Sequence, residues 1–393
     1  MNGSNKLVVT WLGVVCATVI IMVVVGGVTR LTGSGLSMVD WKPIMGIVPP
    51  MDEAEWQAAF DAYKEFPEYR EVNRGMDLDG FKRIFFWEYA HRVLGRLIGI
   101  LFFVPLVVFW LAGKIESHYK VPMLVALGLG GMQGLLGWYM AESGLIDIPR
   151  VSHYRLAAHL SLAMFIMSYL FWLALSVAGV GVSAVSGRLR SVLYLLTVLL
   201  VLQIVFGAFT AGMRAGYGYN TWPLMNGQFM ADAVFIMKPL WANFFESGPT
   251  VQFIHRWLAV LVLAVSAAAS LLARRETPRV KWAAALMLAA LFVQFAIGVL
   301  TLVQVVPVTL GTIHQGWACF VLLALVYLLY ASRPADAHEA TYEARLGQRS
   351  IRRPVIPKVT SAAFVEVSML RAQQVATSYC FRSSAFRATC IRI

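Results

Sequence analysis

The 393-residue chain is 59% hydrophobic and only 14% charged, and its formal net charge is +12. Soluble globular proteins are about a quarter charged, so this composition excludes an ordinary soluble domain and indicates an integral membrane protein. Much of the positive charge lies in short connections between apolar segments and in the C-terminal tail, so it does not indicate a nucleic-acid partner.

Apolar segments of about 20 residues, long enough to cross a bilayer, recur along the chain. We predict eight transmembrane helices, near residues 8–28, 93–113, 121–141, 157–179, 190–212, 253–273, 281–303 and 309–331. The first is not expected to be a cleaved signal peptide, because its apolar core is long and no clear cleavage site follows it. No Arg-rich transit peptide is evident, which favours a bacterial inner (plasma) membrane.

Basic residues concentrate in alternate short connections between these spans. They are Lys114 and Lys120, then Arg188 and Arg190, then Arg274, Arg275, Arg279 and Lys281. The opposite connections carry fewer, so the positive-inside rule predicts that both termini are cytoplasmic. The long segments 30–87 and 213–252 are then expected outside.

The spans form two copies of one four-helix pattern, residues 1–180 and 181–333. The matched residues are Gly26 with Gly207, Thr29 with Thr210, Gly35 with Gly216, Trp41 with Trp222, His91-Arg92 with His255-Arg256, Gln133 with Gln294, Gly137 with Gly298, and His159 with His314. An even number of spans separates the members of each pair, which predicts a pseudo-two-fold axis along the membrane normal. The expected fold is an all-α integral membrane protein of two pseudo-symmetric four-helix bundles.

Four of the seven histidines belong to this repeat, and each begins an even-numbered span. They are His91, His159, His255 and His314. A single histidine in a membrane span is more often a hydrogen-bonded structural group, but four at one predicted depth favour a functional role. Two imidazoles that face each other across a helix bundle are typical axial ligands of haem iron. Zinc or copper also binds imidazole, but no thiolate or carboxylate set completes such a site.

Arg92 and Arg256 directly follow two of these histidines. They are candidates for binding haem propionates, and interfacial anchoring to lipid headgroups is the equally weighted alternative.

The two halves differ beside these histidines. Glu88 stands three residues before His91, on the same helical face, whereas Gln252 stands three residues before His255. A carboxylate in a site of low dielectric constant can take up or release protons. The first half is therefore the better candidate for chemistry and the second for a resident cofactor, unless Glu88 only pairs with Arg92. Residues 52–72 predict an amphipathic helix that covers the first-half site or is simply part of the loop.

Several motifs resemble the haem A synthase family over roughly residues 8–331. They are Gly27-Val28-Thr29-Arg30-Leu31-Thr32-Gly33-Ser34-Gly35-Leu36-Ser37, Asp40-Trp41-Lys42-Pro43, Glu88-Tyr89-Ala90-His91-Arg92, Phe253-Ile254-His255-Arg256-Trp257 and Ile313-His314-Gln315-Gly316. The lack of an outer-loop cysteine pair suggests the proteobacterial or mitochondrial-like branch.

The resemblance implies an oxidoreductase that converts haem o to haem a for cytochrome oxidase assembly, by oxidising the C8 methyl group of the porphyrin to a formyl group. It also implies that His91 and His159 flank the haem o substrate, that Glu88 is needed for activity, and that His255 and His314 bind haem b. Haem O synthase and an unidentified electron donor are the possible protein partners.

Two other functions share parts of this pattern. A di-haem membrane cytochrome linked to quinone would keep two haems and make no formyl product, and a transporter with a histidine proton relay would be colourless. The polar, Arg-rich tail 334–393 matches nothing in the family and is expected to be disordered or to come from an altered reading frame.

Overall fold

Eight long helices dominate the computed structural model, which describes residues 3–39, 48–145 and 151–334. They are α1 (Gly3–Leu31), α3 (Leu78–Leu111), α4 (Ser117–Leu145), α5 (His153–Val177), α6 (Gly187–Gly212), α8 (Gly248–Ala273), α9 (Pro278–Val303) and α10 (Val308–Ala331). Each is long and apolar enough to cross a membrane, and the described residues contain no β-strand element. The eight predicted spans are therefore confirmed, and the chain is a multi-pass membrane protein.

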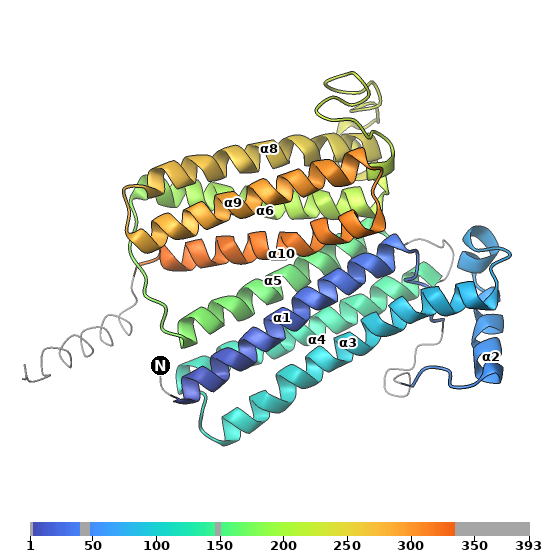
Figure 1. Cartoon of the computed structure of the whole chain (residues 1–393), viewed down its shortest axis with the longest axis horizontal. Coiled ribbons are helices and arrows are strands. Elements are labelled where there is room, and N and C mark those ends of the chain that lie inside the picture. The colour runs from blue at the N-terminus through green and yellow to red at the C-terminus, as the bar shows by residue number, and fades with distance from the viewer. Residues whose placement is uncertain (1–2, 40–47, 146–150, 335–393) are drawn as a thin grey trace, which may run out of the picture. The chain divides into compact units, whose positions relative to one another are not determined.

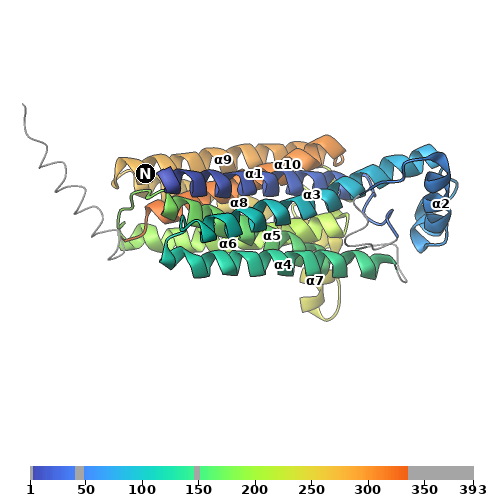
Figure 2. The same ribbon diagram turned by 90° about the horizontal axis from the view of Figure 1, so that it is seen from below.

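The connections between the long helices contain short helical elements. Two precede α3, namely α2 (Glu53–Lys64) and η1 (Glu68–Val72). Three precede α8, namely η2 (Ala215–Tyr217), η3 (Leu240–Ala242) and α7 (Asn243–Glu246). Figures 1 and 2 show α2 and the segment between α6 and α8 at one end of the long helices, which we call the loop end. The start of α1 and the end of α10 lie at the opposite end.

Local sequence signals explain where α3 begins and ends. The carboxylate of Asp77 accepts a hydrogen bond of 2.8 Å from the backbone N–H of Gly80, which caps the first turn. Beyond the last turn, Gly113 adopts a φ of +64°, a conformation that suits glycine. The backbone N–H of Lys114 then donates to the carbonyl of Phe109 at 2.9 Å, as expected where a left-handed residue ends a helix.

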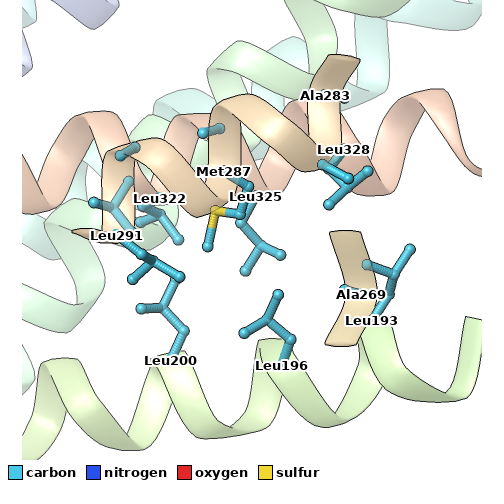
Figure 3. Close-up of a cluster of buried hydrophobic side chains, with 14 of the residues drawn as sticks. Leu193, Leu196, Leu200, Ala269, Ala283, Met287, Leu291, Leu322, Leu325 and Leu328 are labelled. Atoms are coloured by element: carbon cyan, nitrogen blue, oxygen red, sulfur yellow. The ribbon is translucent and has the colours of Figure 1, made fainter. Parts of the chain in front are cut away.

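The largest apolar core joins helices from both halves of the sequence. Figure 3 shows its part between α6, α8, α9 and α10, where Leu196, Met287 and Leu325 are fully buried. The same core includes Val19 of α1 and Met167 of α5. Packing therefore crosses the predicted boundary near residue 180: α1 contacts α3, α5 and α10, and α5 contacts α4, α6 and α10. The division into two separate four-helix bundles stays a prediction.

Two sequence predictions fall outside the described residues. They concern the Asp40-Trp41-Lys42-Pro43 motif, which includes the partner of Trp222 in the repeat, and the tail from residue 335 onward.

Candidate functional site

The four repeated histidines lie on four different helices, in two pairs. His91 of α3 and His159 of α5 are close enough to interact electrostatically. His255 of α8 and His314 of α10 interact in the same way. The structure thus brings together one predicted pair from each half of the sequence.

A glycine of a neighbouring helix faces each imidazole. A Cβ atom added to the glycine would lie 2.8–3.0 Å from Cε1 of the histidine, which is tighter than nine in ten real Cβ contacts. The facing pairs are Gly26 with His91, Gly137 with His159, Gly207 with His255, and Gly298 with His314. The glycines that the repeat matched are therefore positions at which any side chain would displace a candidate ligand.

The imidazoles also carry unused hydrogen-bonding capacity. Nδ1 of His91 and Nδ1 of His255 are buried and have no hydrogen-bond partner. A buried polar atom without a hydrogen-bond partner costs about 1–3 kcal/mol. The two unpaired nitrogens therefore favour the binding of a group to these imidazoles. Among residues 3–39, 48–145 and 151–334, no cluster of three or more His, Cys, Asp or Glu side chains could hold a bare metal ion. Paired imidazoles facing glycines fit the two axial ligands of a haem.

Glu88 lies in α3 one helical turn before His91, and its side chain is almost completely buried. One carboxylate oxygen accepts hydrogen bonds of 2.8 Å from the hydroxyl of Ser37 and from the backbone N–H of Met38. The other oxygen pairs with Nη2 of Arg92 at 2.6 Å. Three donors thus hold the carboxylate in place. The alternative expectation was that Glu88 only pairs with Arg92, and the contacts with Ser37 and Met38 go beyond that pair.

The second half repeats this arrangement without the carboxylate. Gln252 replaces Glu88, and its Nε2 donates to the carbonyl of Tyr219 at 3.0 Å. Tyr219 and Met38 are equivalent in the repeat, and the preceding residues are Gly218 and Ser37, so the hydroxyl donor is missing as well. The first site therefore has an acidic group and a hydroxyl that binds it, and the second site lacks both.

Both arginines next to the histidines bind the connecting segments at the loop end. Nη2 of Arg92 donates to the carbonyl of Met38 at 3.0 Å. Arg256 donates to the carbonyls of Tyr219 at 2.5 Å and of Thr221 at 2.7 Å. These contacts anchor both segments on the long helices, and the predicted role of the arginines toward haem propionates stays a prediction.

The segment 52–72 is helical, as its amphipathic pattern predicted, and packs on the beginning of α3. Phe60 and Tyr63 of α2 are buried against Phe81 of α3, with ring centroids 5.1 and 5.2 Å apart. Glu68 is buried in the same cluster and accepts a hydrogen bond of 3.3 Å from the Tyr63 hydroxyl. Burial and the nearby Glu88 carboxylate raise the pKa of Glu68 to about 8.

Sequence inspection named Ser37 only within a motif and overlooked Gln203 and Met22. Ser37 lies 51 residues before Glu88, and nothing local in the sequence predicts their contact. Gln203 aligns with Met22 in the repeat, so a search for residues that are identical in the two halves finds neither position. In the structure, Nε2 of Gln203 donates a hydrogen bond to the backbone carbonyl of His255.

Comparisons with known proteins agree with these features. Residues 9–326 match the family model described as cytochrome oxidase assembly protein, COX15-CtaA. The chain is 47% identical to Heme A synthase of Parvibaculum lavamentivorans, over 81% of this chain and 92% of that protein. It is 44% identical to Heme A synthase of Nitrosospira multiformis, over 84% of this chain and 94% of that protein. The chain therefore belongs to the COX15-CtaA family of cytochrome oxidase assembly proteins.

Proposed function

We propose that the chain is a haem A synthase, an oxidoreductase that converts the C8 methyl group of haem o to the formyl group of haem a. Haem o, the substrate, binds between His91 and His159 in the first half. Haem b, a resident cofactor, binds between His255 and His314 in the second half. Relatives that are 41–47% identical over most of the chain carry the name Heme A synthase, which supports this proposal.

One observation carries the assignment of roles to the two halves. Two histidine pairs face glycines in the same way, but only the first has a buried carboxylate one turn away, held by a hydroxyl, a backbone N–H and an arginine. A site that only passes electrons needs no acidic group, whereas a site that oxidises a methyl group must dispose of protons.

The balance of the reaction explains why a proton acceptor and an electron path are both needed. If water supplies the oxygen atom, converting a methyl to a formyl group releases four protons and four electrons. Glu88 is placed to accept protons beside the substrate, and Arg92 holds its carboxylate in one orientation. Haem b, when bound, supplies single-electron transfer. The external electron partner is an unidentified redox protein or quinone.

The cellular setting follows from the same proposal. The protein lies in a bacterial inner membrane with both termini in the cytoplasm, as the distribution of basic residues predicts, so the loop end faces the periplasm. An enzyme that makes haem o, a haem O synthase, must supply the substrate.

Replacing Glu88 by Gln tests this function, because it gives the first site the amide found at Gln252. We expect the Glu88→Gln variant to bind haem o and haem b with the wild-type absorbance spectrum. Haem a formation should fall by about 100- to 10,000-fold, the usual contribution of a general acid or base. Haem extraction and mass spectrometry measure the product.

The matched control is Glu116→Gln, because Glu116 is a half-exposed carboxylate that follows α3, at the end opposite the loop end. This control should make haem a at the wild-type rate. Undiminished haem a formation by the Glu88→Gln variant would reject the role of Glu88. A wild-type protein that holds two haems and never forms a formyl product would instead indicate an electron-transfer cytochrome.

A further inference from the structure

Three of the four candidate iron ligands have a glutamine amide against their own backbone, and His91 does not. In each of the three, the glutamine lies one helical turn before the glycine that faces the histidine. Its Nε2 donates to the backbone carbonyl of that histidine at 3.1–3.2 Å. The three combinations are Gln133 with His159, Gln203 with His255, and Gln294 with His314.

Met22 occupies the fourth position. It lies one turn before Gly26, which faces His91, and it aligns with Gln203 in the repeat. The methyl carbon of Met22 lies 3.4 Å from where a Cβ of Gly95 would be. In an α-helix the N–H of Gly95 pairs with the carbonyl of His91, so the thioether takes the place that an amide takes at the other three sites. A thioether donates no hydrogen bond and is only a weak acceptor.

The amides also reach two of the imidazoles. Nε2 of Gln133 is 3.2 Å from Nδ1 of His159, and Nε2 of Gln294 is 3.3 Å from Nδ1 of His314. The Oε1 atoms of Gln133, Gln203 and Gln294 are buried without a partner. A half-turn of the amide would therefore let Oε1 accept the Nδ1–H of a histidine whose other nitrogen binds iron.

Such a hydrogen bond strengthens a metal ligand. A metal-binding histidine normally donates its second ring N–H to an acceptor, which fixes the ring and raises its basicity. Loss of that acceptor typically weakens the metal site by about 10- to 100-fold. His91, whose buried Nδ1 has no partner and whose neighbour is Met22, is accordingly the weakest of the four ligands.

We propose that Met22 makes His91 the exchangeable ligand, so that iron bound in the first half can release His91 and take a small molecule at that position. The bond between iron and His91 breaks, a bond to the incoming ligand forms, and no electron changes hands. The proposal rests on the proposed function, because it assumes haem o between His91 and His159. It answers a chemical need, since an iron with two tightly held histidines has no free position.

The test substitutes Met22 by Gln and measures carbon monoxide binding to the reduced protein loaded with haem b and haem o. We expect carbon monoxide to bind the first-half haem of the wild type. In the Met22→Gln variant its affinity should be lower by about 10- to 100-fold, with haem o still bound. Met22→Leu is the matched control, because leucine fills similar space without an acceptor and should keep the wild-type affinity.

A mirror variant extends the test to the second half. Gln203→Met removes the amide beside His255, so the haem b site should become reactive toward carbon monoxide, which its wild-type form should not be. If Met22→Gln fails to fold, the Gln203→Met result decides: a haem b that stays inert contradicts the inference.

The outcomes also separate the two proposals. Unchanged carbon monoxide affinity in a haem-o-loaded Met22→Gln variant overturns the role of Met22 alone. A wild-type protein that binds haem b but gives no spectral change with haem o overturns the proposed function.

Discussion

Replacing Gly137 by alanine tests whether the facing glycine keeps the His159 imidazole in place. A Cβ at residue 137 would lie 2.9 Å from Cε1 of His159. Non-bonded carbon atoms approach to about 3.5 Å, so the ring would have to retreat by roughly 0.6 Å, the difference between these distances. It cannot do so freely, because Nε2 of Gln133 lies 3.2 Å from its Nδ1 and 3.1 Å from the His159 carbonyl.

The expected effect on haem binding is larger than the effect on folding. Overfilling a packed site costs about 1–3 kcal/mol, and alanine recovers about 0.5–1 kcal/mol of helix stability relative to glycine. The net destabilisation of the Gly137→Ala variant is then about 0–2.5 kcal/mol. A shift of 0.6 Å exceeds the tolerance of about 0.2 Å for metal–ligand distances, so haem o affinity should fall by about 10- to 100-fold.

The assay is a haem o titration of the purified protein, followed by absorbance, together with a thermal unfolding curve. Gly134→Ala is the matched control on the same helix, because its added Cβ meets no atom within 4 Å. The control should bind haem o like the wild type. Equal haem o affinity of the two variants would refute the argument that Gly137 sets the position of His159.

Two further predictions concern the loop end. The protonated form of Glu68, whose pKa is raised to about 8, contributes stability that is complete below the ordinary carboxyl pKa and is lost as the pH rises through about 8. Limited proteolysis of the segment 52–72 should therefore accelerate as the pH rises from the ordinary carboxyl pKa to about 8 and level off above it in the wild type but not in Glu68→Gln, and the same acceleration in both would contradict this. Arg256→Ala should lower the free energy of unfolding by about 1–3 kcal/mol, because the carbonyl of Thr221 loses the Arg256 donor and that of Tyr219 keeps only Gln252. A chemical denaturation curve that matches the wild type would contradict it.

Much of the fold could be predicted because its signals are local. In a bilayer every backbone polar group must be satisfied within the segment, so a long apolar segment must become a helix. The spans near residues 93–113 and 309–331 accordingly appear as α3 and α10. The sequence also predicted that His91 and His159 correspond to His255 and His314, because a duplication preserves the order of residues along the chain.

The contacts of the site depend on how the helices are rotated and packed, which the sequence does not encode locally. Only the tertiary structure places Gly26 against His91, brings Ser37 to Glu88 and sets Met22 against Gly95. In a soluble helix, hydropathy identifies the buried face. A membrane helix is apolar nearly all round, so hydropathy does not determine how that helix is rotated. The sequence by itself therefore determined the spans, the duplication and the candidate ligands, whereas side-chain packing between helices decided which residues surround each ligand.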